Sequence, residues 1–431
     1  MSYLFSRFLI VVMSFFILGV SVSAEKKEDF PYEELNNFIE VYSTIRNYYV
    51  DDKKGPELLD NAIKGMVSEL DPHSDYLPKK SFVELGEQAT GQFGGLGIEV
   101  EKNDAGIKVI APIEDSPAAL AGIRAGDIVL TVDGTLLKGL SLTEAVELMR
   151  GEVGSEVKLS VYRESEDASL SFQFKRDIVK VSSVKVKKYK DNVIYIRLSK
   201  FQSNSFSELK KKVSELYIKS SDVKGFILDL RNNPGGVINS AVDVVGFFRG
   251  AGLVTYTEGR STARRNYSYD SDSEYKNTPL VVLINEGSAS ASEIVSGALQ
   301  DYHHSVIVGR KSFGKGTVQS MIPFDNGAGV KITTARYYLP SGRTIQNEGV
   351  IPDVIIPELK VKEVQGFKDY AGEASYSNSV KAKASAVKDS KSLDKAADEK
   401  ILTTPDPEKD FELFSAYNVL KSLMAIKRKD S

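Results

Sequence analysis

Apolar and polar positions alternate along the chain with two different periods, and changes of period divide the sequence into regions. Between about residues 30 and 88 the chain looks helical, and the second of two runs of apolar residues at helical spacing stops at the Asp71-Pro72 pair. From 91 to about 176, short apolar runs between glycine turns predict strands with one helix, 141–149. From about 179 to 358, apolar runs alternate with helical patterns, which predicts an α/β layered core. We therefore expect a multidomain chain of α+β and α/β character.

The expected core has a regular succession of elements. Its predicted strands are 193–198, 225–230, 279–285, 306–308 and 330–338, its predicted helices are 205–216, 241–248 and 290–301, and the segment 317–323 looks extended.

Both ends of the chain differ from this core. Residues 365–400 are rich in Ala, Ser, Lys and Asp without apolar periodicity, which is typical of a mobile tether. Apolar residues at helical spacing follow it and predict a short terminal helix, which could dock on this chain or on a partner. The helices near the two ends could build a homodimer, or could bury their apolar faces within one chain.

The N-terminus has the pattern of a secretory signal peptide. Arg7 precedes the apolar stretch 8–20, and Val22-Ser23-Ala24 is a small-residue cleavage site. The stretch is short for a spanning helix, which needs roughly 20 residues. We expect export to a periplasm or the exterior of a cell envelope. The alternative is an uncleaved anchor that associates with the membrane.

These patterns define the expected domains. They are a signal peptide at 1–24, an N-terminal helical region at 25–90, a compact unit at 91–178, an α/β core at 179–360, a flexible low-complexity segment at 361–404 and a C-terminal helix at 405–431.

Composition limits the possible partners and the possible catalytic residues. The 431 residues are 42% hydrophobic and 27% charged with a formal net charge of −3, so nothing indicates a nucleic-acid partner. There is no cysteine, which excludes disulfides, thiol catalysis and thiolate metal sites.

A cluster of serines, Ser288, Ser290 and Ser292, stands between the predicted strand 279–285 and a predicted helix. A serine at such a turn exposes its hydroxyl, and the next backbone N–H and the helix N-terminus can stabilise an oxyanion. However, Ser290 and Glu293 also have the spacing of a capping box. From the cluster alone, helix capping is the favoured interpretation.

A candidate base lies downstream at Lys315, in a turn between Gly314 and Gly316. Lysine acts as a base only when burial or nearby positive charge lowers its pKa. Gln319, four residues on, could orient the amine without the negative charge that would raise that pKa. A third segment, 230–236, ends in Pro-Gly-Gly and offers either a second oxyanion donor or a tight turn.

The unit at 91–178 resembles a PDZ domain across all its elements. The matching loop is Gly95-Leu96-Gly97-Ile98. The resemblance implies that backbone N–H groups here hold a peptide's C-terminal carboxylate while the peptide adds a strand to the sheet edge. The alternative is that these glycines only form a bulge in a small barrel.

Three motifs together, 229–236, 287–294 and 313–319, resemble those of the carboxy-terminal processing (tail-specific) peptidases, which are PDZ-containing serine peptidases. The similarity extends over about 35–358 and includes the turn 71–77. It implies Ser290 as nucleophile, Lys315 as general base and Gln319 as its orienting residue, with oxyanion donors at the N–H groups of Gly236 and Ala291. It also implies protein or peptide substrates with accessible C-termini, and no cofactor or metal.

Several features invite other interpretations. The segment 309–315 is close to a phosphate-binding loop, but Gly316 stands where magnesium binding requires Ser or Thr. His303 and His304 are adjacent and therefore poorly placed to share one ion, so we expect packing or surface histidines. We expect Asp301, at a position proposed to be functional in some relatives, to brace its helix, and His73 to have no catalytic role.

A different class of function is a catalytically inactive, PDZ-type peptide-binding adaptor.

Overall fold

The predicted fold class is confirmed: in the computed structural model, helices and a small sheet domain precede a layered α/β core. The structure describes residues 30–113, 116–217, 223–359, 401–402, 404–406 and 409–427. The predicted signal peptide, 1–24, and most of the predicted tether, 361–404, lie outside the described residues. Within the described ranges, no helix has the length and apolar character needed to cross a membrane.

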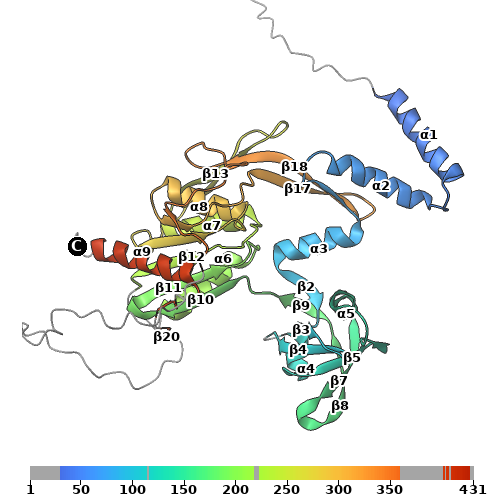
Figure 1. Ribbon diagram of the computed structural model, residues 1–431, viewed down its shortest axis with the longest axis horizontal. Helices are drawn as coiled ribbons and strands as arrows, with labels where there is room; N and C mark the ends of the chain where they lie inside the picture. The colour runs from blue at the N-terminus through green and yellow to red at the C-terminus, as the bar shows by residue number, and fades with distance from the viewer. Residues whose placement is uncertain are drawn as a thin grey trace, which may run out of the picture. The chain divides into compact units, whose positions relative to one another are not determined.

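The chain divides into two units, residues 1–66 and 67–431. The first holds helix α1 (Tyr32–Tyr48) and most of helix α2 (Gly55–Ser68), where the sequence predicts helices (Figure 1). Apolar residues of α1 such as Phe38 and Ile39 remain exposed, and the helix buries no side chain. The second unit contains all the other described elements.

Helix α3 (Lys79–Thr90) ends at Gly91, whose φ of 70° is the left-handed conformation that terminates many helices. The chain then enters the PDZ-like domain, where strands β2 (Gln92–Gly95) and β9 (Asp177–Lys180) pair with each other. The chain between these two strands forms a separate six-stranded sheet in the order β3-β4-β5-β7-β8, with β6 paired to β5. Its elements are β3 (Ile98–Lys102), β4 (Ile107–Pro112), α4 (Pro117–Ala121), β5 (Ile128–Val132), β6 (Thr135–Leu136), α5 (Leu142–Met149), β7 (Glu156–Arg163), η1 (Glu164–Glu166) and β8 (Ala168–Lys175).

The core is built on a seven-stranded sheet in the order β19-β16-β15-β12-β11-β10-β20. From β11 to β19 neighbouring strands are parallel. Parallel strands are buried on both faces, which is why they read as continuous apolar runs. The elements are β10 (Val184–Tyr189), η2 (Lys190–Asn192), β11 (Val193–Leu198), α6 (Ser205–Tyr217), β12 (Gly225–Asp229), α7 (Ile238–Arg249), β15 (Leu280–Ile284), α8 (Ala291–Asp301), β16 (Val306–Gly309), β19 (Val354–Ile355) and β20 (Ile401–Leu402).

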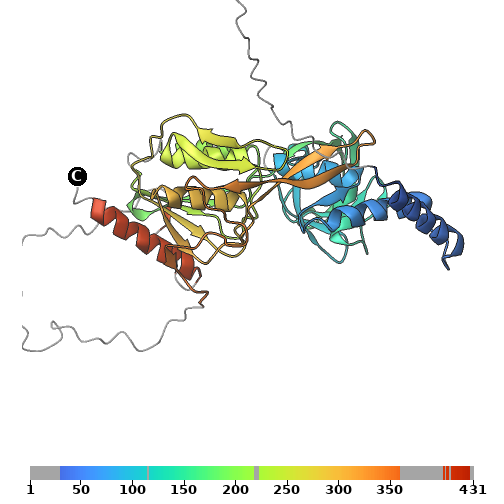
Figure 2. The ribbon, with the colours of Figure 1, turned by 90° about the horizontal axis from the view of Figure 1, so that it is seen from above.

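Alternate residues of these strands enter two different hydrophobic cores, because successive side chains of a strand point to opposite faces. Phe226 and Leu228 of β12 pack with residues of α6, α7 and α8. Ile227, between them, packs on the other face with helix α9 (Phe411–Lys427). Figures 1 and 2 show α9, coloured red, lying beside the sheet. The predicted terminal helix therefore docks on its own chain.

A second sheet of the core has the order β1-β18-β13-β14, with β17 also paired to β18. Strand β18 is predicted from the sequence, and the extended segment 317–323 is confirmed as β17. Strand β1, just after the Asp71-Pro72 turn, pairs with β18 and so joins that turn to the core. The strands are β1 (Asp75–Leu77), β13 (Gly252–Glu258), β14 (Arg265–Tyr269), β17 (Thr317–Pro323) and β18 (Gly329–Tyr338).

Candidate active site

The three core motifs singled out in the sequence follow three neighbouring parallel strands. The glycine-rich segment 230–236 follows β12, the serine cluster follows β15, and the turn with Lys315 follows β16. Because the carboxyl ends of parallel strands lie at the same edge of a sheet, this topology brings the motifs together.

Ser290 occupies the sharp turn between β15 and α8, with φ of 56° and ψ of −113°. Such a conformation costs a non-glycine residue about 1–3 kcal/mol and persists only when its surroundings hold it. The other two serines of the cluster are fully buried. Ser288 and Ser292 donate their hydroxyls to the carbonyls of Leu230 (2.8 Å) and Asn233 (2.9 Å). The Ser290 N–H donates to Glu293 Oε2 (2.8 Å), as in a capping box, so the strained turn of Ser290 is present in addition to its place at the start of α8.

The segment after β12 approaches the Ser290 turn very closely. A Cβ atom on Gly235 would lie 2.7 Å from the Ala289 carbonyl oxygen and 2.8 Å from the Ser290 Cβ. In the part of the chain that the structure describes, neither the Gly236 N–H nor the Ala291 N–H donates to another residue. Ala291 is the first residue of α8, where the helix itself supplies no acceptor. Both amides are therefore available to an oxyanion.

Glu293 joins the serine turn to the lysine turn. Its fully buried carboxylate accepts hydrogen bonds through Oε2 from the N–H groups of Ser290 (2.8 Å) and Lys315 (2.9 Å). Through Oε1 it accepts from the Gly314 N–H and the Ser312 hydroxyl, both at 2.6 Å. Burial raises the pKa of Glu293, and these hydrogen bonds act in the opposite direction. One carboxylate thus fixes the backbone on both sides of the site.

Lys315 is half-buried, and its ammonium forms no hydrogen bond or ion pair with any described residue. Burial, followed by the charge of Lys331, lowers the pKa of Lys315 below its usual range, while Asp71 and Glu293 oppose the shift. The shift has the direction that a lysine base needs, because only the neutral amine accepts a proton. Burial and the Lys315 charge likewise lower the pKa of His73, which places this histidine within electrostatic range of the lysine.

Gln319 is placed near the serine, and its orienting role stays a prediction. Its amide nitrogen donates to the hydroxyls of Thr317 (3.0 Å) and Thr333 (3.1 Å). Both of these hydrogen bonds hold Gln319 against the β17–β18 pair, and neither reaches Lys315.

A cavity of about 320 Å³ opens at the serine turn. It is lined by Gly236, Asn239, Arg265, Ser290, Gln319 and Tyr337, among others. The structure therefore brings three of the predicted site residues, Gly236, Ser290 and Gln319, to one cavity. Lys315 does not line it and is connected to Ser290 through Glu293.

The predicted peptide-binding loop lies in the PDZ-like domain, between β2 and β3. Leu96 is buried, and Gly97 has a φ of 76° that favours glycine. The Gly97 carbonyl accepts from the Ile113 N–H (2.8 Å) and the Ser116 hydroxyl (2.9 Å), which fixes the loop. Strand β3 has β4 as its one partner in this sheet, so its other edge is open to an added strand.

Other polar residues have structural contacts. The Asp301 carboxylate accepts from Arg343 Nε (2.8 Å) and the Ser341 N–H (3.0 Å), as expected of a bracing residue. Within the described residues, no group of three or more His, Asp or Glu side chains is placed to hold a metal ion.

Two residues of the site were missed in the sequence. The Ser-x-x-Glu spacing marks Glu293 in the sequence, but only as a capping residue. Tyr337 is fully buried, donates its hydroxyl to the Lys315 carbonyl and interacts with the Ser290 side chain. No local pattern marks Tyr337, because strand β18 brings it to the site from a distant part of the sequence.

Known families match three consecutive parts of the chain. The sequence models are those of the activating protease CtpB N-terminal domain at residues 18–81, the PDZ domain at 94–174 and Peptidase family S41 at 192–356.

Individual proteins match over most of the chain. The carboxy-terminal-processing protease of Bartonella bacilliformis is 37% identical over 423 residues, which cover 94% of this chain and 95% of the relative. A probable CtpA-like serine protease of Staphylococcus aureus is 37% identical over 358 residues, or 82% of this chain and 71% of the relative. Among solved structures, a photosystem II D1 C-terminal processing protease is 31% identical with a TM-score of 0.43, covering 75% of this chain and 93% of that one.

Proposed function

Because the chain belongs to the S41 family of PDZ-containing carboxy-terminal-processing serine proteases, we propose that it is an endopeptidase acting near substrate C-termini through a Ser290–Lys315 dyad. The observation that carries the proposal is the Glu293 carboxylate. It binds the N–H groups of both dyad residues and holds Ser290 in its high-energy turn conformation at the cavity. A serine that only capped a helix would need neither the strained backbone of Ser290 nor the bond from Glu293 to the lysine turn.

The reaction would proceed by acyl transfer. Neutral Lys315 takes the proton of the Ser290 hydroxyl as its oxygen attacks the scissile carbonyl carbon. The N–H groups of Gly236 and Ala291 stabilise the negative charge that develops on the carbonyl oxygen. The C–N bond then breaks, and Lys315 returns the proton to the leaving amine. Water, deprotonated by Lys315, attacks the ester, and the proton returns to Ser290.

The PDZ-like domain would select substrates by their C-termini. The rigid loop before β3 would present backbone N–H groups to the terminal carboxylate, and the open edge of β3 would accept the peptide as a further strand. Export to the cell envelope, membrane association through the N-terminal segment and a homodimer remain proposals that rest on the sequence.

Cleavage of a defined substrate tests the proposal. Wild type and Ser290→Ala would be incubated with an unfolded protein bearing an apolar C-terminus, and the products identified by mass spectrometry. We expect wild type to release C-terminal fragments and Ser290→Ala to lose activity by about a millionfold, as removal of the nucleophile does in another serine peptidase. Tail binding by Ser290→Ala should persist. Cleavage by Ser290→Ala at the wild-type rate would contradict the assignment of the nucleophile, and a wild type that binds tails without cleaving would indicate an adaptor.

A further inference from the structure

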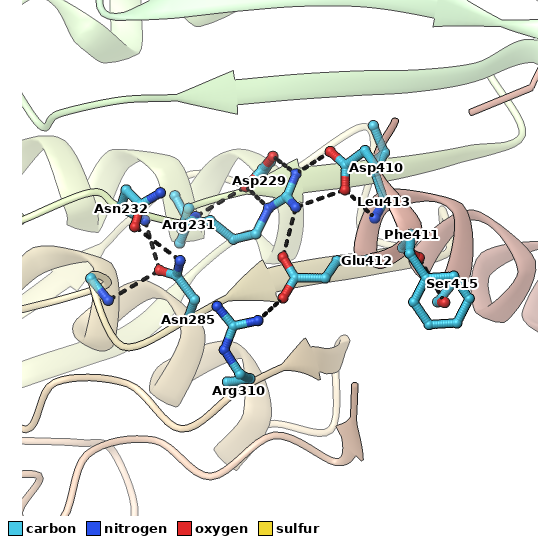
Figure 3. A network of polar contacts seen from close by, with 12 residues as sticks. Asp229, Arg231, Asn232, Asn285, Arg310, Asp410, Phe411, Glu412, Leu413 and Ser415 are labelled. Atoms are coloured by element: carbon cyan, nitrogen blue, oxygen red, sulfur yellow. Dashed lines mark hydrogen bonds and ion pairs between the residues drawn. The ribbon is translucent and has the colours of Figure 1, made fainter. Parts of the chain in front are cut away.

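The side chain of Arg231, just after β12, lies among three carboxylates (Figure 3). Its Nη2 donates to Asp229 Oδ2 (2.7 Å) and to Asp410 Oδ2 (2.8 Å). Its Nη1 donates to Asp410 Oδ1 (2.9 Å) and Glu412 Oε2 (2.8 Å). Two of the three acids belong to the segment at the start of α9, although Arg231 lies far from it in sequence. Only 15% of the Arg231 side chain is exposed, so water screens these contacts little.

Glu412 extends the contact to the next two strands of the sheet. Its Oε1 accepts from Arg310, which follows β16. Arg310 Nε in turn donates to Glu286 Oε2 (2.9 Å), which follows β15. The start of α9 therefore contacts, directly or through one residue, the chain after each of the three strands that carry the site motifs. Figure 3 shows Glu412 between Arg231 and Arg310.

The candidate oxyanion segment follows Arg231 directly in the chain, and hydrogen bonds hold its start. The neighbouring Asn232 has a φ of 53° and donates its N–H to Asn285 Oδ1 (2.8 Å). The Asn285 amide donates back to Asn232 Oδ1 (2.9 Å). The segment then runs through Gly235, which packs on the Ser290 turn, to Gly236 at the cavity. Arg231 thus fixes the start of the segment that carries the Gly236 N–H, and Asn232 and Asn233 add further hydrogen bonds along it.

Helix α9 docks by apolar packing as well as through these carboxylates. Leu413, Ala416, Tyr417 and Leu420 are buried against the sheet and anchor the helix by apolar packing. The Asp410 side chain also caps α9, since its Oδ1 accepts from the Leu413 N–H (2.9 Å). The carboxylates of Asp410 and Glu412 are therefore placed to act on Arg231 in addition to what the packing provides.

We propose that Asp410 and Glu412 are positioning residues for catalysis. Through Arg231 they hold the 230–236 segment so that the Gly236 N–H points at the developing oxyanion. The inference rests on the proposed roles of Ser290 and Gly236. It assigns the chain beyond the region matched by the S41 family, residues 192–356, a direct part in building the active site.

The full-length double variant Asp410→Asn, Glu412→Gln tests this proposal. Both changes keep shape and remove charge, and asparagine preserves the helix cap. The control is Lys409→Gln, which removes an exposed ion pair with Asp406 in the same segment. With a peptide substrate, we expect the double variant to lose about tenfold in kcat with KM within about twofold, because an oxyanion donor acts mainly in the transition state. The control should match wild type.

Amide hydrogen exchange read by mass spectrometry gives a second readout that does not depend on activity. Peptides covering 231–237 should exchange faster in the double variant, while α9 peptides and the control keep the wild-type pattern. Wild-type kcat, a change in KM alone, or unchanged exchange at 231–237 would each overturn the proposal. If the double variant fails to fold, Glu412→Gln, which leaves the cap intact, decides by the same readouts. An inactive wild type would instead contradict the proposed function. The exchange data would still test whether Asp410 and Glu412 hold the 230–236 segment.

Discussion

The Glu293 carboxylate accepts more hydrogen bonds than a neutral side chain of the same shape can accept. Its two oxygens accept four hydrogen bonds, three of them from backbone N–H groups on opposite sides of the site. A glutamine has one accepting oxygen, and its amide nitrogen would face N–H donors with donors of its own. The buried carboxylate therefore sets the distance between the Ser290 and Lys315 turns.

We predict that Glu293→Gln lowers kcat by at least about tenfold and stability by about 1.5–3 kcal/mol, the cost of unmaking hydrogen bonds to a buried charge. Steady-state kinetics and thermal unfolding measure the two effects. Glu144→Gln is the matched control, because Glu144 has the same Ser-x-x-Glu spacing and accepts from the Ser141 N–H, but at an exposed helix start. Equal losses in both variants would mean that Glu293 only caps a helix.

At the residue scale, the sequence predicts a functional residue when its type and its neighbours in the chain together indicate the chemistry. Ser290 and Lys315 are visible because a serine turn and a glycine-flanked lysine follow apolar strands. The Ser290–Glu293 spacing is visible too, but it reads as helix capping, since the partners of Glu293 across the site come from another loop. Tyr337 and Lys331 act on Lys315 only because β17 and β18 fold together, and no spacing rule reveals that.

At the scale of elements, the site depends on how closely the segment after β12 approaches α8. A methyl group at Gly235 has no space, and the φ of 98° there disfavours any side chain. A substitution would push the candidate oxyanion donor at Gly236 away from the serine.

We expect Gly235→Ala to reduce kcat by about a hundredfold, the scale of loss that a displacement of about 1 Å can cause at an active site. Gly342→Ala is the control. Its φ of 86° is also left-handed, but an added Cβ would meet only the Tyr256 hydroxyl, at 3.7 Å. Comparing kcat for the two variants separates steric displacement from general backbone strain, and similar kcat values would contradict the account.

The elements also differ in how far they can be predicted. Strands β12 and β15 are buried along their whole length, and their continuous apolar runs predict them well. Strand β14, Arg265–Tyr269, is partly exposed and lies at a sheet edge, so its polar alternation carries little signal. Its residues nevertheless line the cavity. The sequence thus predicts the sheet that positions the Ser290 and Lys315 turns better than the strands that line the cavity.

At the scale of the whole molecule, one chain joins a PDZ domain to a peptidase core. If the PDZ-like domain captures the terminal carboxylate, a substrate with an amidated C-terminus should be cleaved with kcat/KM lowered by about tenfold or more, because a charged acceptor is lost. The same peptide with an acetylated N-terminus is the control and should react at the original rate. Equal kcat/KM for free and amidated tails would show that the tail is not read.

The pH dependence of kcat/KM tests the central claim, a serine activated by a neutral lysine, most directly. The pKa of Lys315 is lowered by burial and by Lys331, yet below that pKa the amine is protonated and cannot accept the serine proton. We predict that kcat/KM rises with pH from about pH 5 and levels off above the pKa of Lys315. That pKa lies below the ordinary lysine value of about 10.4. Lys315→Ala should remove the pH-dependent activity. A flat profile between about pH 5 and pH 9, or wild-type activity in Lys315→Ala, would contradict the account.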